Sequence, residues 1–390
     1  MNQMQQRYID ATNKFAALYG GGRETARFSV PGRSEILGNH TDHNHGCVIA
    51  AAVDLDIIAV ASRSEGNRIR IKSEGFEEDI VEIGTNNVEK FTSAALIAGV
   101  CDGFIKRGCN VGGFDAYTTS DVLKGSGLSS SAAFEVMVGT ILNHLYNGGN
   151  IPAVEIAKIG QYAENVFFGK PCGLMDQIAC AVGGFVAIDF ADEPIIEKLD
   201  FDLNAFGYKM CIVNTGGSHA DLNEDYASIP GEMKKVAAYF GKKFLREVEP
   251  CDIMNNIPKL REYAGDRAML RAIHFCEENE RVEKAKHCTL PEFLQLINAS
   301  GNSSYKKLQN IYSVKDVNEQ GLAIALALCE SILDPKTTAH RVHGGGFAGT
   351  IQVFLPSDDV ERFKTVIENV FGAGSCLTLN TRNYGAVYET

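Results

Sequence analysis

The chain of 390 residues lacks the features that mark membrane and secreted proteins. No apolar run reaches the roughly 20 residues that a membrane span needs, and the first residues contain no apolar core of a signal peptide. Basic runs are also missing, and the net charge of -12 opposes nonspecific attraction to nucleic acid or to anionic membranes. We therefore expect a cytoplasmic protein with neither a nucleic-acid nor a membrane partner.

Closely spaced cysteine pairs and two common nucleotide-binding signatures are missing as well. The eleven cysteines are scattered singly, with no C-x-x-C, which argues against a disulfide framework or a zinc module and favours reduced, mostly buried thiols. No G-x-x-x-x-G-K-[ST] segment occurs, so the chain is not an ordinary P-loop protein. Gly344, Gly346 and Gly349 match G-x-G-x-x-G, but a strand-like TIQVFL follows where a dinucleotide site needs a helix. A nicotinamide enzyme is therefore disfavoured.

The composition that is present is that of a globular protein, with 45% hydrophobic and 22% charged residues, and the length favours two domains. Helical spacing is found up to residue 19 and in residues 89–107, 130–147 and 151–169, and strand patterns in 46–63, 68–74, 185–190, 210–215 and 349–355. A more polar passage begins after residue 192, where we expect a domain boundary. The second half alternates helices with strands, which favours helices packed on a mixed sheet.

The segment GSGLSSSAA, which begins at Gly125, is a candidate phosphate site. Gly125 and Gly127 permit close approach of the backbone to a ligand. Ser129, Ser130 and Ser131 open a predicted helix, whose N-terminus offers free N–H donors and about half a positive charge to a phosphate. Serine hydroxyls there can bind phosphate or a magnesium ion. The alternative interpretation is a helix N-cap with additional serines.

The segment GNHTDHNHG, residues 38–46, gathers His40, Asp42, His43 and His45. Imidazole and carboxylate suit zinc, iron or nickel, so a metal site is one interpretation. A strand would place His43 and His45 on one face, whereas a helix would bring His40 and His43 together, although the glycines and asparagines argue against a long helix. An ordinary polar loop is the alternative.

Four segments, in this order, resemble the motifs of the GHMP kinases and, among them, of the galactokinase branch. GRSEILGNHTDH from Gly32 resembles G-R-x-N-L-I-G-E-H-x-D-Y, GSGLSSSA from Gly125 matches P-x-G-x-G-L-S-S-S-A, PCGLMDQ from Pro171 contains the base of galactokinases, and HGGGFAG from His343 resembles T-G-G-G-F-G-G. The resemblance extends from about residue 8 to residue 390.

The resemblance implies an α+β fold of two GHMP kinase domains. The N-terminal domain, residues 1–192, would have a mixed sheet and contain the sugar loop, the phosphate-binding loop and the catalytic aspartate. The C-terminal domain, residues 193–390, would be a ferredoxin-like α/β sandwich that contributes a glycine-rich closing loop. The implied activity is ATP- and Mg²⁺-dependent phosphorylation of the anomeric C1 hydroxyl of galactose or a close relative, by a monomer or weak dimer.

The resemblance also assigns roles to individual residues. Asp176 would accept or orient the proton of the C1 hydroxyl, and Arg33 would neutralise charge on the transferred phosphoryl group. A cation close to Asp176 should depress its pKa, which favours orientation over strong basicity. The residues implied to bind sugar are Asn39, His40, Asp42, Gly173 and Tyr226; those implied to bind nucleotide are Gly125, Ser126, Gly127, Leu128, Ser129, Ser130, Ser131 and Ala132; those implied to bind metal are Ser130, Ser131 and Glu164; and those of the closing loop are Gly345, Gly346 and Phe347.

Each of these roles has an ordinary structural alternative. Asp176 can be a carboxylate at a helix start, and Glu164 a solvated helix residue. The late glycines can form a simple turn before a strand. The histidine segment resembles a sugar loop, in which His43 replaces the usual tyrosine and His45 faces solvent.

Two residues depart from the family motif. Asn39 stands where galactokinases usually have a glutamate directed at the end of the sugar remote from C1, and Glu35 replaces an asparagine. A neutral amide donates and accepts hydrogen bonds, whereas a carboxylate only accepts, so galacturonate or another C6-modified galactose is an alternative substrate. A non-catalytic, kinase-derived sugar sensor is a third interpretation, which the intact GSGLSSSAA, Arg33 and Asp176 disfavour.

Overall fold

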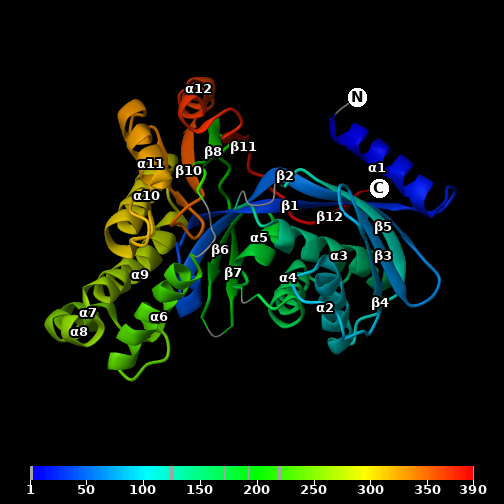
Figure 1. Cartoon of the computed structure of the whole chain (residues 1–390), viewed down its shortest axis with the longest axis horizontal. Coiled ribbons are helices and arrows are strands. Elements are labelled where there is room, and N and C mark those ends of the chain that lie inside the picture. The colour runs from blue at the N-terminus through cyan, green and yellow to red at the C-terminus, as the bar shows by residue number, and fades with distance from the viewer. Residues whose placement is uncertain (1–2, 123–126, 171, 192, 218–221, 390) are drawn as a thin grey trace. The chain divides into compact units, whose positions relative to one another are not determined.

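The computed structural model of the chain describes residues 3–122, 127–170, 172–191, 193–217 and 222–389 (Figure 1). Its contacts divide it into two compact units, each built from segments that are separate in the sequence. Unit 1 contains Met1–Arg33, Ala52–Gly184 and Arg382–Thr390, and unit 2 contains Ser34–Ala51 and Phe185–Thr381. The sequence predicts a boundary after residue 192 between two domains that are each continuous in the chain. The two units are not continuous in this way, so that boundary stays a prediction.

Unit 1 is built on a mixed sheet in the order β12-β1-β2-β5-β3-β4. The strands are β1 (Ala26–Leu37), β2 (Cys47–Arg63), β3 (Arg68–Ser73), β4 (Glu78–Glu82), β5 (Phe114–Ser120) and β12 (Val387–Glu389). β3 and β5 are parallel, whereas β2 and β5, and β3 and β4, are antiparallel. β1 and β2 are rich in buried apolar residues, as expected for strands at the centre of a sheet. Both strands also belong in part to unit 2.

The helices of unit 1 pack on one another and on this sheet. They are α1 (Gln3–Tyr19), α2 (Ser93–Lys106), α3 (Ser130–Asn147), α4 (Ala153–Tyr162) with a π-helical extension (Ala163–Phe168), and α5 (Met175–Val182). Figure 1 shows α2 to α5 gathered beside the sheet. Thr92 caps α2 by accepting a hydrogen bond from Ala95 N–H, which satisfies a free donor of the first turn. Tyr8, Phe15 and Ile58 are buried in the contact between α1 and the sheet.

Unit 2 contains a four-stranded sheet in the order β11-β8-β10-β9. The mixed sheet expected for the second half of the chain is wrong, because all three strand pairs of this sheet are antiparallel. Its strands are β8 (Tyr208–Asn214), β9 (Ala339–His343), β10 (Thr350–Pro356) and β11 (Cys376–Leu379). The start of β2 pairs with β6 (Phe185–Asp189), and β6 pairs with β7 (Ile195–Leu199). Apolar side chains of β8 and β10 form a buried core with those of two helices, α11 (Gly321–Ile332) and α12 (Val360–Phe371).

A second core of unit 2 is almost entirely helical. The other helices of this unit are α6 (Asn223–Tyr239), α7 (Pro250–Asn255), α8 (Ile257–Ala264), α9 (Asp266–Ala285) and α10 (Leu290–Ser303), with short turns at Asp42–Asn44, Leu245–Glu247, Ser304–Leu308 and Ser357–Asp359. Thr289 and Glu292 form a capping box at the start of α10. Phe347 packs into this helical core, so the glycine-rich segment is anchored at that residue.

The α+β class and the periodic segments predicted from the sequence are confirmed, with boundaries shifted by a few residues. Within the described residues, no helix combines the length and the apolar character needed to span a bilayer.

Candidate active site

Arg33 and Asp176 form an ion pair in unit 1. Arg33 lies in β1, and Asp176 lies in the first turn of α5. The Arg33 Nε donates to Asp176 Oδ1 at 2.7 Å, and the Ser129 hydroxyl donates to Asp176 Oδ2 at 2.5 Å. Both carboxylate oxygens are therefore fixed in position. Burial raises the pKa of Asp176, but the Arg33 charge and the hydrogen bonds from Arg33 and Ser129 outweigh burial and hold the pKa below its ordinary value.

The serine-rich loop is attached to the same arginine. Arg33 donates from its guanidinium to the Gly127 carbonyl at 2.6 Å, and its backbone N–H donates to the Leu128 carbonyl at 3.1 Å. Gly127 and Ser129 both have positive φ, +75° and +56°, a conformation that costs a serine energy and is often found at functional sites. Ser130 and Ser131 then begin α3, as predicted. The other two candidate residues of this loop, Gly125 and Ser126, lie outside the described residues.

Glu164 lies in the π-helical extension of α4 and is almost fully buried. It accepts a hydrogen bond from the Ser131 hydroxyl at 3.3 Å and one from the Gln177 amide at 3.0 Å, and Lys170 Nζ lies 3.4 Å away. The donor set of Ser131 and Glu164 consists of oxygens only, which suits a hard cation such as Mg²⁺.

Gln177 and Glu135 are two residues of this cluster that sequence reasoning missed. The Gln177 amide nitrogen also donates to Glu135 Oε2 at 2.9 Å, so one amide bridges two buried carboxyl groups. Burial and the neighbouring Glu164 raise the pKa of Glu135 well above its ordinary value. The sequence offered only weak signals for these two residues. Gln177 directly follows Asp176, and Glu135 lies on the same helix face as Ser131, which is four residues earlier.

The histidine-rich loop belongs to unit 2, and its shape is fixed by a tight turn. Gly38 has φ +96°, and a Cβ there would lie 2.4 Å from the Cys47 carbonyl oxygen, so no other residue fits without rearrangement. The buried Thr41 hydroxyl bonds to the carbonyls of Gly38 and Cys47 at 2.9 and 2.8 Å. Asp42 then begins a 3-10 turn and remains partly exposed. The loop is therefore a rigid turn rather than a strand or a long helix.

The three imidazole rings of this loop have different partners. His40 Nε2 lies 2.8 Å from the Gly345 carbonyl oxygen, and His43 is largely exposed, 3.7 Å from Asp42. His45 stacks on Phe244 with ring centroids 3.7 Å apart, and its side chain is partly exposed, so it faces solvent only in part.

These contacts do not bring the three histidines to one point. In the described part of the chain, the group that could hold a metal ion is Cys47 with Asp189 and Glu283, and it contains no histidine. Arg246 donates to both Cys47 Sγ and Asp189 within that group.

The protonation state of His40 follows from its contact. A carbonyl oxygen only accepts hydrogen bonds, so Nε2 carries the proton and Nδ1 keeps its lone pair. Burial lowers the pKa of His40 to about 4, so the ring is neutral at pH 7. His40 also has φ +60°, which is uncommon for a residue with a side chain. Its Nδ1 can accept a hydrogen bond from a hydroxyl group.

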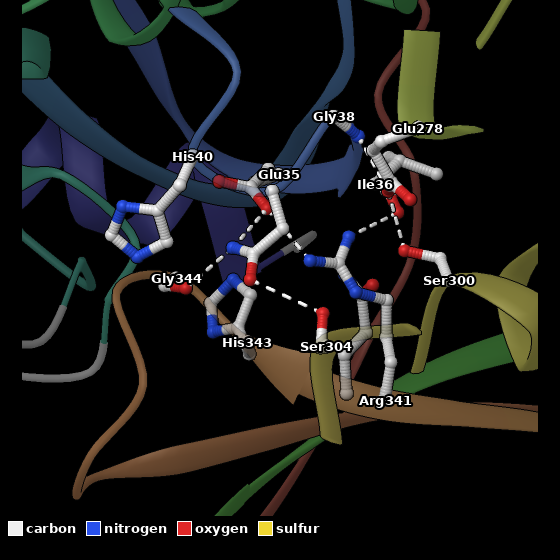
Figure 2. A network of polar contacts seen from close by, with 12 residues as sticks. Glu35, Ile36, Gly38, His40, Glu278, Ser300, Ser304, Arg341, His343 and Gly344 are labelled. Carbon is white, nitrogen blue, oxygen red and sulfur yellow. Dashed lines mark hydrogen bonds and ion pairs between the residues drawn. The ribbon is translucent and has the colours of Figure 1, made fainter. Parts of the chain in front are cut away.

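Asn39, the other predicted residue of this loop, lies in a buried polar network with Glu35 and Arg341. Its amide nitrogen donates to Glu35 Oε1 at 2.9 Å and to the Gly344 carbonyl at 2.8 Å. Arg341 is fully buried and donates to Glu35 Oε1 at 2.8 Å. Figure 2 shows Glu35, His40, Arg341 and Gly344 around this network. The Asn39 amide nitrogen therefore donates to protein groups, and the assignment of Asn39 to the sugar stays a prediction.

The predicted closing loop meets Tyr226 within unit 2. The Tyr226 hydroxyl donates to the Gly346 carbonyl at 3.1 Å, and its ring meets Phe347 edge to face with centroids 5.5 Å apart. A Cβ at Gly345 would lie 2.6 Å from Tyr226 Cε1, and one at Gly346 would lie 2.1 Å from the Asn310 carbonyl oxygen. Both glycines are therefore required by close packing. Gly173, the remaining candidate, lies in the irregular segment before α5 in unit 1.

Two family models match parts of the chain. The model of the GHMP kinases N terminal domain matches residues 95–184, and the galactokinase galactose-binding signature matches residues 13–63. The first range contains the serine-rich loop, Glu164 and Asp176, and the second contains Arg33 and the histidine-rich loop.

Relatives cover nearly the whole chain. The galactokinase of Clostridium acetobutylicum is 31% identical over 360 residues, which are 90% of each chain. The galactokinase of Streptomyces coelicolor is 30% identical over 366 residues, which are 92% of each chain. Among solved structures, the galactokinase of Lactococcus lactis complexed with galactose has a TM-score of 0.81 at 22% identity, covering 96% of this chain and 98% of that chain. The mevalonate kinase of Methanococcus jannaschii has a TM-score of 0.64 at 15% identity, with 93% and 99% covered. Because this identity extends over nine tenths of both chains, the protein belongs to the galactokinase family of the GHMP kinases.

Proposed function

We propose that the protein is a galactokinase, which transfers the γ-phosphoryl group of ATP to the C1 hydroxyl of galactose. The observation that carries this proposal is the full-length similarity to galactokinases, which includes the galactose-binding signature. In the reaction, the C1 oxygen forms a bond to the γ-phosphorus, the bond from that phosphorus to the β-phosphate oxygen breaks, and the products are galactose 1-phosphate and ADP. ATP use also follows from membership of the GHMP kinases.

Asp176 and Arg33 are the residues that we assign to catalysis. The contact with Arg33 keeps Asp176 ionised, and the two hydrogen bonds to its carboxylate fix its direction. A carboxylate with a lowered pKa is a weak base, so Asp176 mainly orients the C1 hydroxyl and takes up its proton as the new bond forms. Arg33 places a permanent positive charge at this point, which stabilises negative charge on the phosphoryl group.

The nucleotide and the metal are assigned to the same unit. We assign the loop from Gly125 to Ala132 to the phosphates of ATP, because the start of α3 at Ser130 offers free backbone N–H donors. Ser131 and Glu164 are the residues that we expect to hold Mg²⁺, with Ser130 as a second hydroxyl in the same turn. Mg²⁺ bound there would neutralise phosphate charge. The partly buried contact between Ser131 and Glu164 supports this assignment.

The sugar is assigned to His40, Asp42, Gly173 and Tyr226. His40 offers an acceptor nitrogen and Asp42 an acceptor carboxylate, and sugar hydroxyls donate to both. Gly345, Gly346 and Phe347 form the closing loop, whose Gly345 carbonyl holds the His40 ring. The alternative substrate, galacturonate or another C6-modified galactose, rests on Asn39 facing the sugar, and the buried contacts of Asn39 give it no support. A cytoplasmic location and a monomer or weak dimer remain part of the proposal.

The test is ATP-dependent release of ADP with a panel of monosaccharides. Galactose, galacturonate and glucose are compared at saturating ATP and Mg²⁺, and the position of the phosphate is determined by NMR. We expect the highest kcat/KM with galactose and a 1-phosphate product. A higher kcat/KM with galacturonate would favour the alternative substrate. Binding of galactose without ADP release would instead indicate a sugar sensor.

A further inference from the structure

The two positions at which this chain departs from the family motif are in direct contact. The motif that residues 32–43 resemble, G-R-x-N-L-I-G-E-H-x-D-Y, has an asparagine and then a glutamate at these positions, whereas this chain has Glu35 and then Asn39. Both residues lie in unit 2, and the Asn39 amide nitrogen donates to Glu35 Oε1 at 2.9 Å. The pair of positions therefore keeps one amide and one carboxylate, with their places exchanged.

The Asn39 amide is saturated by protein groups. Its nitrogen donates twice, to the Glu35 carboxylate and to the Gly344 carbonyl, while its oxygen accepts from Asn310 Nδ2 at 2.9 Å and from the Ser304 hydroxyl at 3.3 Å. Glu35 and Gly344 offer only acceptors, so the amide cannot be reversed without placing oxygen against oxygen. The side chain is fully buried. Direct contact with a sugar would require these bonds to break.

The Glu35 carboxylate balances a buried cation. Arg341 in β9 donates to Glu35 Oε1 at 2.8 Å and to the Ile36 carbonyl at 2.6 Å, and its side chain is fully buried. Loss of one partner from such a pair leaves an uncompensated buried charge. A glutamate at position 39 beside Glu35 would add a second carboxylate to the same site, and like charges in contact are strongly unfavourable. Glu35 together with a glutamate at position 39 would place two carboxylates side by side. Asn39 together with an asparagine at position 35 would leave no carboxylate in the pair to balance Arg341.

The network fixes the backbone of the closing loop. Asn39 holds the Gly344 carbonyl, and Asn310 donates to the Gly345 carbonyl at 3.1 Å as well as to Asn39. The same Gly345 carbonyl holds the His40 ring. The Asn39 side chain thus helps to place the Gly344 carbonyl, and the next carbonyl, that of Gly345, contacts the His40 ring.

We propose that Glu35 and Asn39 are a coupled pair in which carboxylate and amide have exchanged places, and that Asn39 is a positioning residue for the closing loop and not a sugar ligand. The predicted effect on sugar phosphorylation rests on the proposed function. The coupling between Glu35 and Asn39 is a property of the folded protein and does not depend on that function. The specificity for the C6 end of the sugar then depends on groups other than the Asn39 amide.

The coupling is tested by a double-mutant cycle of thermal stability, which needs no catalytic activity. Glu35→Asn and Asn39→Glu should each lower the Tm by about 5 °C or more, because the first removes the carboxylate that is paired with Arg341 and the second adds a like charge. The double variant should recover more than half of the larger loss. If the decrease in Tm of the double variant equals the sum of the decreases of the two single variants, the coupling is overturned. If a single variant does not fold, folding of the double variant supports the coupling, and failure of the double variant to fold overturns it.

Two further measurements separate positioning from contact. Asn39→Ala removes the amide without adding charge, and its kcat/KM is measured with galactose and with 6-deoxygalactose. We expect kcat/KM to fall about tenfold for both sugars, so that their ratio stays within about twofold of the wild-type ratio. A change of tenfold or more in that ratio would show that Asn39 contacts the C6 hydroxyl and would overturn the positioning role.

The control is Asp359→Asn, which removes a carboxylate from an exposed ion pair with Arg362 and should leave both the Tm and the ratio unchanged. If the wild-type protein phosphorylates neither sugar, the proposed function is contradicted. The double-mutant cycle of Tm values would still show whether Glu35 and Asn39 are coupled.

Discussion

The Arg33 guanidinium lies 2.7 Å from the Asp176 carboxylate, and the two residues are 143 positions apart in the chain. This contact joins a residue of the galactose-binding signature to one of the GHMP kinase domain. It also holds Asp176 in its ionised form, since the positive charge and the hydrogen bonds overcome the effect of burial. A residue in this state is better suited to orient a hydroxyl group than to remove its proton in advance.

Replacement of the carboxylate tests this role. Asp176→Asn should lower kcat about a hundredfold or more, because the amide cannot take up the proton of the hydroxyl. The KM for galactose should stay within severalfold of the wild-type value. Steady-state kinetics and a melting curve, which checks the fold, are the measurements. Turnover close to that of the wild type in a folded variant would contradict the assignment.

The charge of Arg33 sets the acid limb of the pH profile. With Arg33 present, the pKa of Asp176 lies below its ordinary value of 3.8, so kcat/KM should not fall until the solution is more acidic than that. In Arg33→Gln the lowering charge is lost while burial remains, so the acid limb should move to higher pH. The profile of kcat/KM between about pH 4 and 8 detects this shift, because the wild-type profile should stay flat at its acid end and the profile of the variant should fall there. If the acid limb of Arg33→Gln lies at the same pH as that of the wild type, Arg33 does not control the ionisation of Asp176.

Stability should depend on the protonation of His40. The pKa is about 4 in the folded protein against an ordinary 6.5, so in this interval the unfolded chain binds more protons. The free energy of unfolding therefore decreases as the pH falls from 6.5 towards 4. His40→Gln removes this contribution, and its Tm should change less than that of the wild type between about pH 7 and 5. His287→Gln, at an exposed position, is the control and should keep the wild-type slope.

The metal assignment predicts a dependence on Glu164. Glu164→Gln should raise the Mg²⁺ concentration needed for half-maximal activity by about tenfold or more, because an amide is a weaker ligand than a carboxylate for a hard cation. Glu155→Gln, in a partly exposed ion pair on α4, is the matched control and should behave like the wild type. Elemental analysis should find no stoichiometric transition metal. About one such ion per chain, lost in His43→Gln, would restore a metal site in the histidine-rich loop.

The closing loop has no room for a side chain at Gly345. The added methyl group of Gly345→Ala would lie 2.6 Å from the Tyr226 ring, which should destabilise the loop by about 1–3 kcal/mol and lower kcat/KM for galactose. Gly231→Ala in α6 is the matched control, since no heavy atom lies within 4 Å of the added carbon. That variant should keep its activity and gain up to about 1 kcal/mol. Equal behaviour of the two variants would argue against a packed closing loop.

The sequence by itself determined the local structure of this protein and the chemical character of its motifs. The periodicity of residues 130–147 predicts α3 because a helix repeats its buried face every three to four residues, and such a pattern needs no distant partner to be recognised. The four motifs and their order are likewise found in short segments, and the α+β class is what their resemblance to the GHMP kinases implies. The alternation of RIRIKSE likewise places β3 correctly.

Only the tertiary structure decided which motif residues meet. Asn39 and Gly344 are 305 positions apart, and their hydrogen bond depends on how β1 and β9 are brought together by the packing of unit 2. The sequence therefore presents Glu35 and Asn39 as two separate departures that weaken the case for galactose, whereas the folded chain places them in contact around the buried Arg341. The physical reason is that a buried polar group must find its partner wherever the fold provides one, and that choice is a property of long-range packing and not of local sequence.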